Sequence, residues 1–285
     1  AVNAEEPDAL FVDPANWRRG IGRALVEHCC AAAKSAGAGS LHVLGNHVKV
    51  EKRPRDPQHC MLNVIGEACM LLQAGIDVQY KDHMGTDKTV VNAARVSFSK
   101  DDLEPFNGKD EKLISYLAKH NHWSPFAHTS IQLKIKAPIF VARQLVKHQV
   151  GQVWNEVSRR YVDFEPEFWV PTELRGRPVN AKQGSAGTVD PSYIEIISKS
   201  YEITLVAYNT LIQAGVAPEQ ARIVLPLGSM TDWYWTGTLV FWARVCKLRL
   251  DPHAQEETAM VAKSINDIVA PLFPVSWAAL MAQSS

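Results

Sequence analysis

The chain has 285 residues, 46% of them hydrophobic, which is long enough to bury at least one sizeable core. Thirty Lys and Arg residues balance thirty Asp and Glu residues, so no overall field draws the chain to nucleic acid or to an anionic membrane. Its five cysteines lack CxxC spacing, so we expect reduced thiols in a cytoplasmic protein and no metal site. We find no run of about 18 apolar residues and no secretion signal, which argues against a membrane span.

The first 46 residues contain a strand, a basic turn with glycines and the start of a helix. Free backbone N–H groups in such a unit can hold a pyrophosphate. Residues 11–46 resemble the acetyl-CoA-binding motif of the GCN5-related acetyltransferases, with Arg18-Arg19-Gly20-Ile21-Gly22 as the pyrophosphate loop. The strands that this family places around the motif are missing, and about 45 residues bury little surface. We therefore interpret residues 1–46 as a non-functional acetyltransferase-like fragment, a strand–turn–helix remnant.

Residues 47–75 predict a charged linker with two prolines and then a short helix over 61–74. From residue 76 the pattern is tighter. Alternation predicts a strand over 76–80, and Met84-Gly-Thr-Asp87 predicts a turn and the cap of a helix that runs through Arg95. Further along, the sequence predicts a helix over 111–120, a half-buried strand over 131–136, and a helix over 139–149 that begins at Pro138.

The second half of the chain reads as mainly helical. Residues 162–190 predict a long loop rich in proline and glycine. Apolar residues at helical spacing over 194–212 predict a long amphipathic helix that ends at Gly215, and three more helices are expected over 218–223, 231–249 and 253–269. We expect an α+β domain over residues 76–285, with an antiparallel sheet flanked by helices.

Polar side chains gather in residues 143–161, which hold basic residues, a carboxylate, a hydroxyl and several side-chain amides. Arg143 and Lys147 are four residues apart, as are Gln144 and His148, so each pair shares one face of the predicted helix. This inventory can hold phosphate groups and the edge of a base. It indicates a site for a phosphorylated, nucleotide-like ligand.

Four ordered motifs carry a second resemblance. Asn155-Glu-Val-Ser-Arg-Arg-Tyr161 is similar to the signature loop of the flavin-dependent thymidylate synthases (the ThyX type). Three further segments resemble that family in the same order, and the match covers about residues 76–282. The first is Ala94–Phe98, the second is His122–His128 followed by Lys136–Gln144, and the third is Ala221–Pro226 followed by Leu248-Arg249 and His253–Gln255.

This resemblance implies reductive methylation of dUMP to dTMP, with methylenetetrahydrofolate as the carbon donor and FAD, reduced by NADPH, as the hydride donor. It also implies a homotetramer with shared active sites. The implied catalytic residue is Arg249, a fixed cation beside the uracil. The implied dUMP-binding residues are Gln144, Lys147, Glu156, Ser158, Arg160, Arg222 and Arg249. The implied FAD-binding residues are His122, Ser124, Lys147, His148, Gln149, Glu156, Thr238 and Arg244. The family usually has Arg-His-Arg where this chain has Lys147-His148-Gln149.

Other interpretations remain open at the level of sequence. The chain could be a catalytically weakened flavin- or nucleotide-binding protein, or a module for single-stranded nucleic acid, although its neutral charge argues against the latter. Cys246 could be a thiol nucleophile, but its apolar neighbours favour core packing. Trp233, Trp235 and Trp242 indicate packing in a buried helix rather than a base-stacking platform.

Overall fold

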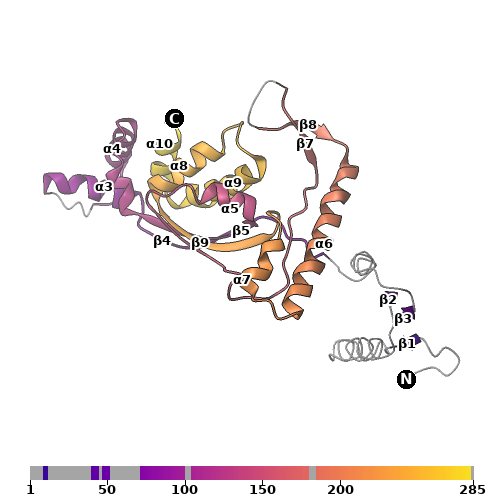
Figure 1. Ribbon diagram of the computed structural model, residues 1–285. Helices are drawn as coiled ribbons and strands as arrows, with labels where there is room; N and C mark the ends of the chain where they lie inside the picture. Colours follow the sequence, from indigo (N-terminus) through magenta and orange to yellow (C-terminus); the bar gives the residue numbers. More distant parts are fainter. Residues whose placement is uncertain are drawn as a thin grey trace. The chain divides into compact units, whose positions relative to one another are not determined.

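The computed structural model describes residues 9–11, 40–44, 47–51, 71–99, 104–179 and 184–283. By its contacts the chain forms two compact units, Ala1–Leu71 with Ser200–Gly215, and Leu72–Lys199 with Val216–Ser285. Figure 1 shows the described helices and strands of both units.

The N-terminal strands form a three-stranded antiparallel sheet. Its order is β1 (Ala9–Phe11), β3 (His47–Glu51) and β2 (Ser40–Leu44), so β3 pairs with both of the others. The linker prediction is therefore wrong for residues 47–51, whose alternating His-Val-Lys-Val-Glu sequence suits a strand. The expected helix after the basic turn and the short helix over 61–74 lie outside the described residues, apart from residues 71–74, which are not helical.

A four-stranded antiparallel sheet organises the larger unit. Its strand order is β4 (Asp77–Met84), β5 (Ser130–Pro138), β9 (Met230–Thr238) and β6 (Gln152–Glu156). Strict alternation turns Ile131, Leu133 and Ile135 of β5 into the core, as predicted. Leu133 lies opposite Trp235 of β9, and both side chains are fully buried. The α+β class with an antiparallel sheet flanked by helices is confirmed.

Helices pack on this sheet and enclose a single large cluster of buried apolar side chains. They are α3 (Asp87–Arg95), η2 (Val96–Phe98), α4 (Gly108–Lys119), η3 (Ser124–His128), α5 (Ile139–Leu145), α8 (Leu239–Arg249), α9 (Glu256–Leu272) and α10 (Pro274–Met281). Figure 1 shows α5, α8 and α9 on one side of β5 and β9. Their ends bring several polar side chains of the predicted site to the same place.

Three sequence predictions are wrong around that site. The helix expected over 139–149 is the seven-residue helix α5, which ends at Leu145. Glu156, expected on a loop, ends strand β6. The helix expected over 231–249 is strand β9 followed by α8, because Trp233 and Trp235 alternate with polar residues at a period of two. Their predicted burial is confirmed, but on a strand rather than a helix.

The remaining described elements are short, apart from one long helix. They are β7 (Leu174–Gly176) and β8 (Ala186–Val189), which form a small hairpin in the predicted long loop, with η4 (Pro191–Tyr193), α6 (Ile194–Gln213), α7 (Pro218–Ala221) and η5 (Arg222–Val224). The long helix predicted over 194–212 is confirmed, and Gly215 follows it in the left-handed region at φ +83°. Helix α10 was not predicted; buried Asp87 accepts hydrogen bonds from the backbone N–H groups of Val275 and Ser276 at its start. In the described part of the chain, no helix has the length and apolar character to cross a bilayer.

Candidate active site

Three predicted residues meet where helices α5 and α8 end. Arg249 is the last residue of α8; its Nε donates to His148 Nε2 at 3.1 Å and its Nη2 to the backbone carbonyl of Gln144 at 3.4 Å. Because α5 stops at Leu145, the Gln144 carbonyl is one of the last carbonyls that the helix leaves without an internal partner. The guanidinium satisfies it, as cations commonly do at helix C-termini. The early end of α5 thus fixes the position of Arg249.

This cluster carries one positive charge, and that charge is on Arg249. Burial, together with the positive charge of Arg249, lowers the pKa of His148 below its usual value of 6.5. His148 Nε2 accepts from the guanidinium, so the imidazole is neutral at neutral pH and carries its proton on Nδ1. Burial also lowers the pKa of Arg249, though an arginine stays charged at any physiological pH. A fixed, partly desolvated cation therefore stands beside a neutral ring.

A cavity of about 400 Å³ opens next to this cluster. Its lining includes the side chains of Gln144, Arg249 and Gln255. Gln144 Nε2 donates to Gln255 Oε1, and Thr258 Oγ1 donates to Gln144 Oε1 at 3.3 Å. The two glutamines are thus held against each other at one wall, where their remaining donors and acceptors can meet a ligand. The volume suits a ligand of nucleotide size.

A second layer of charged residues supports this wall. Glu257, only 4% exposed, accepts from Gln255 Nε2 at 2.8 Å and from Arg175 Nη2 at 2.5 Å. Arg175 belongs to β7 and also pairs with Glu256 at 2.7 Å. Burial alone would lower the pKa of Arg175, but the hydrogen bonds and charges of Glu257 and Glu256 raise it. The β7–β8 hairpin is thereby clamped to the start of α9.

Glu156 lies at the end of the edge strand β6 and is held by two donors. Trp154 Nε1 donates to one carboxylate oxygen at 3.2 Å, and Thr231 Oγ1 donates to the other at 2.7 Å. Trp154 also stacks on Trp233, with ring centroids 4.4 Å apart. The carboxylate is exposed but oriented, and each oxygen keeps lone pairs for a further donor.

Ser158, Arg160 and Arg222 are not brought to the Arg249 cluster by any contact within the described chain. Arg160 Nε donates to Ser158 Oγ at 3.0 Å, and its guanidinium lies 4.9 Å from the ring centre of Tyr161. Arg222 is exposed and donates to the carbonyl of Glu219 at 3.2 Å. These hydrogen bonds are all local. No described carboxylate pairs with Arg160 or Arg222, so both cations can take an external anion.

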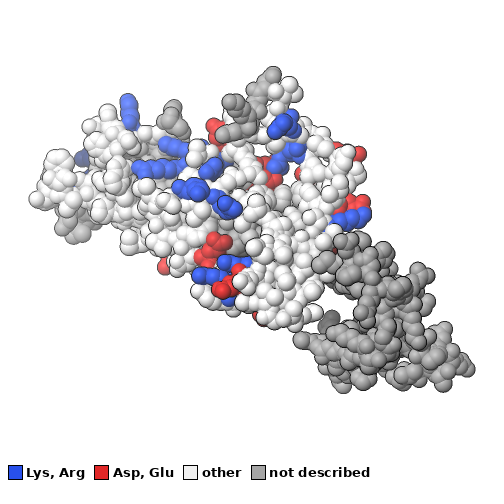
Figure 2. All heavy atoms as spheres, viewed as in Figure 1, with Lys and Arg blue, Asp and Glu red and all other residues white. Residues whose placement is uncertain are grey.

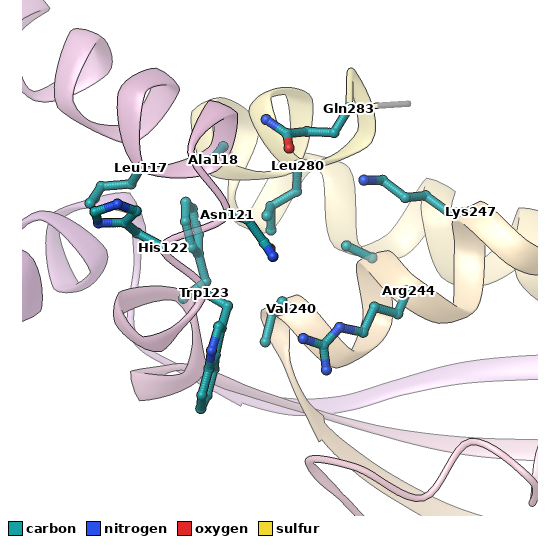
Figure 3. Close-up of a pocket in the computed structure, with 12 residues that line it drawn as sticks. Leu117, Ala118, Asn121, His122, Trp123, Val240, Arg244, Lys247, Leu280 and Gln283 are labelled. Atoms are coloured by element: carbon teal, nitrogen blue, oxygen red, sulfur yellow. The ribbon is translucent and has the colours of Figure 1, made fainter. Parts of the chain in front are cut away.

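The predicted flavin residues fall into two groups. His122 and Arg244 line a smaller cavity of about 70 Å³ between the end of α4 and helix α8, together with Asn121, Trp123 and Lys247. Figure 3 shows the Arg244 and Asn121 side chains directed into this space. The His122 ring instead lies 5.9 Å from Tyr116, ring centre to centre.

The second group is spread over three elements, and only Lys147 and Gln149, which follow α5, flank the Arg249 cluster. Lys147 and Gln149 are exposed on either side of His148, and Ser124 is exposed at the start of η3. Thr238 caps α8: its hydroxyl accepts from Phe241 N at 3.3 Å. Figure 2 shows Lys and Arg side chains gathered over the region of α5 and α8. Lys147, Arg244 and Lys247 form no ion pair with a described carboxylate, which fits a cofactor that carries phosphates.

Sequence reasoning missed part of the site. Gln255, Glu257, Thr258 and Arg175 were not among the predicted residues, although Gln255 was part of a recognised motif. Only the packing of α9 against α5 shows that Gln255 faces Gln144. Cys246 is fully buried, its thiol lies 3.5 Å from the Ala262 carbonyl, and burial raises its pKa far above the usual value. Its core role is confirmed, since a thiol in this state is no nucleophile.

The fold and the site define the class of protein: an α+β enzyme domain that presents arginine and amide side chains to a nucleotide-sized cavity. The chain belongs to the Thy1 family, described as thymidylate synthase complementing protein, whose model matches residues 80–275. It is an enzyme of the flavin-dependent thymidylate synthase type, a methyltransferase of nucleotide biosynthesis. Residues 6–53 separately match the model of the acetyltransferase (GNAT) family.

Curated relatives and solved structures agree with this assignment. The flavin-dependent thymidylate synthase of Thermus thermophilus is 39% identical over 203 residues, which cover 71% of this chain and 74% of the relative. That of Thermosipho africanus is 39% identical over 70% of this chain and 88% of its own length. The UMP/dUMP methylase PolB from Streptomyces cacaoi, solved with 5-Br dUMP, superimposes with a TM-score of 0.69 at 31% identity, over 75% of this chain and 97% of that chain.

Proposed function

We propose that the cavity beside Gln144, Gln255 and Arg249 binds dUMP, and that the chain converts it to dTMP with methylenetetrahydrofolate as the one-carbon donor. The observation that carries this proposal is the convergence of a desolvated guanidinium with oriented amide groups on one nucleotide-sized cavity. The structural relative that holds 5-Br dUMP supports the choice of nucleotide.

Arg249 has the central role in this scheme. A cation held beside the pyrimidine stabilises the negative charge that develops as N3 loses its proton and C5 becomes nucleophilic. Because His148 is neutral, the charge at this spot belongs to Arg249 alone. The capped Gln144 carbonyl holds the guanidinium in place before substrate arrives, so little reorganisation is needed during the reaction.

The remaining dUMP residues would hold the phosphate and ribose. Arg160 and Arg222 offer planar guanidinium groups that form no ion pair with a described carboxylate and that suit a phosphate, and Lys147 offers a further charge. Ser158 and Glu156 complete the set. Since the bonds of Ser158 and Arg160 are local, we infer that this signature loop, Asn155–Tyr161, reaches dUMP from a neighbouring subunit of a homotetramer.

We infer that FAD is the cofactor and that NADPH reduces it. His148, with exposed Lys147 and Gln149, would border the ring close to dUMP, while Arg244, His122 and Ser124 would meet the rest of the dinucleotide. Glu156 and Thr238 complete the proposed set. When bound, reduced FAD would supply the hydride of the reaction. The chain's own side chains would bind, orient and exclude water.

Two measurements test this function. The purified full-length protein should show flavin absorbance, and it should release tritium from C5-labelled dUMP only when methylenetetrahydrofolate and NADPH are both present. Flavin absorbance and dUMP binding without tritium release would favour the weakened-binder alternative. Salt-sensitive binding of a single-stranded oligonucleotide with no flavin present would instead favour the nucleic-acid alternative.

We further propose that residues 1–46 take no part in catalysis. The acetyltransferase match covers only residues 6–53. A variant without residues 1–50 should keep its tritium-release activity, and the full chain should show no acetyl-CoA binding by calorimetry. Micromolar acetyl-CoA binding that disappears on this deletion would contradict the proposal.

A further inference from the structure

A chain of hydrogen bonds runs from the β7–β8 hairpin to the nucleotide cavity. Arg175 donates to Glu257, which accepts from Gln255 Nε2 at its other oxygen. Gln255 Oε1 in turn accepts from Gln144 Nε2. Glu257 is almost fully buried, while Gln144 and Gln255 are half-buried at the cavity wall. Of these four residues, only Gln144 and Gln255 line the cavity.

The donor and acceptor of every hydrogen bond in this series follow from the Arg175–Glu257 pair. A carboxylate paired with a guanidinium can only accept, so Gln255 must turn its NH₂ group toward Glu257. Gln255 then presents its oxygen to Gln144, which must turn its own NH₂ group toward Gln255. Thr258, at the far end, cannot choose the direction, because a hydroxyl accepts as readily as it donates.

We propose that Glu257, backed by Arg175, is a positioning residue that fixes which atoms of the Gln144 and Gln255 amides face dUMP. The inference rests on the function proposed above, because dUMP is the ligand that would form hydrogen bonds with those atoms. An amide held in one orientation offers a fixed donor and a fixed acceptor. An inverted amide of the same shape would place a donor against a donor and leave a buried polar group unpaired.

The decisive variant is Glu257→Gln, which preserves shape. Arg175 only donates, so the new carboxamide must turn its oxygen toward Arg175 and its NH₂ group toward Gln255. Gln255 and Gln144 must then both invert. We expect dUMP affinity, measured by calorimetry on the flavin-loaded protein, to fall about tenfold, as for one mispaired buried group.

Replacement of Arg175 in that background distinguishes orientation from packing. Adding Arg175→Met removes the donor that dictates the direction, so the carboxamide can turn its oxygen back to Gln255. The double variant should recover dUMP affinity to within about threefold of the Arg175→Met single variant, since the mispaired contact is gone. Adding Arg175→Lys, which remains a pure donor, should give no recovery. A packing role predicts that both double variants bind no better than Glu257→Gln.

Glu257→Asp gives a second test, independent of Arg175. The aspartate is shorter but still only accepts, so it should retain more dUMP affinity than the isosteric glutamine; the opposite ranking would overturn the proposal. So would an unchanged affinity in Glu257→Gln, or a lack of recovery with Arg175→Met. If the wild-type protein fails to bind dUMP, the proposed function is wrong. If the wild-type protein binds dUMP but the variants do not follow the expected order of affinities, only the positioning role of Glu257 is wrong.

Discussion

Two parts of the proposed dUMP site differ in how the protein holds them. Gln144, His148 and Arg249 are joined by hydrogen bonds within one chain, and burial shifts the pKa of two of them. Among the described residues, Ser158 and Arg160 form hydrogen bonds only with each other and within their own loop. A single chain therefore preorganises the end of the site that would face the base. The end that would face the phosphate consists of cations that still need a partner.

The largest expected effect is at the preorganised end. Arg249→Ala should lower tritium release from C5-labelled dUMP by about a thousandfold, or about 4 kcal/mol, as for the loss of a preorganised electrostatic contact. Arg249→Lys keeps the charge but lacks the planar guanidinium that donates to both His148 and the Gln144 carbonyl. Its activity should therefore fall between those of the wild type and Arg249→Ala.

Flavin content serves as the control for this variant, because Arg249 lies at a helix end where its loss could disturb the fold. Unchanged flavin content with lost activity would support the assigned role. Full activity in Arg249→Ala would refute it.

The second effect separates the two ends of the site by subunit. If Ser158 and Arg160 reach dUMP from a neighbour, Arg249→Ala and Arg160→Ala carry their defects in different halves of each site. Mixing the two inactive variants under conditions that exchange subunits should restore about one quarter of the activity, the fraction of sites with both halves intact.

The matched control uses a contact seen within one chain. Gln144 and Arg249 touch in the same protomer, so a mixture of Gln144→Ala and Arg249→Ala should stay inactive. No recovery in the first mixture would place Arg160 in the same half as Arg249 and remove the contrast between the two ends. Recovery in the control would show that restored activity does not depend on joining intact halves from two subunits.

The sequence predicts the preorganised end better than its surroundings, for reasons of distance along the chain. Gln144 and His148 are only four residues apart, so the sequence places them close together even though α5 ends between them at Leu145. Their meeting with Arg249, about a hundred residues later, is predicted only through motif resemblance. Glu257 and Arg175 escape prediction altogether, because their pairing depends on how the β7–β8 hairpin packs against α9.

Local patterns also mislead where propensity and tertiary context disagree. Residues 231–238 contain three aromatic residues and directly precede a true helix, so their composition favours one continuous buried helix. The strand forms because alternate tryptophans face the core and pair with β5 and β6. Alternation of Trp233 and Trp235 with polar neighbours is the signal that could have separated strand from helix.

A moderate effect is expected at the flavin border, where this chain has Lys147 and Gln149 in place of two arginines. Gln149 is exposed next to the Arg249 cluster and carries no charge. Gln149→Arg should strengthen FAD binding by roughly three- to tenfold, because it restores a bidentate donor for an anionic cofactor. Fluorescence titration of the flavin-free protein measures the change.

The matched control adds the same charge elsewhere. Gln79→Arg on β4, the opposite edge strand from β6, should leave FAD affinity unchanged. Equal gains in both variants would mean that net charge, rather than contact at residue 149, attracts the cofactor.

The smallest effect tests whether burial of the preorganised end has a cost. The pKa of His148 is lowered in the folded chain by burial and by Arg249. Near pH 6 the unfolded chain therefore binds more protons at this residue, so stability falls as the pH drops below about 6.5. Because His148 is only half-buried, the loss should be a few tenths of a kcal/mol. Between about pH 8 and pH 5.5, the melting temperature of His148→Gln should fall by one or two degrees less than that of the wild type.

The exposed His253, paired with Asp251, is the matched control for this measurement. His253→Gln should leave the wild-type pH dependence of melting in place, since this side chain is 80% exposed and lies outside the Arg249 hydrogen bonds. Asp110, whose pKa is also shifted, titrates below its usual 3.8 and so contributes nothing in this window. An identical pH dependence in the wild type and His148→Gln would show that the imidazole is as well solvated folded as unfolded. The Arg249 cluster would then be open to water in solution, and the contrast between the two ends of the site would weaken.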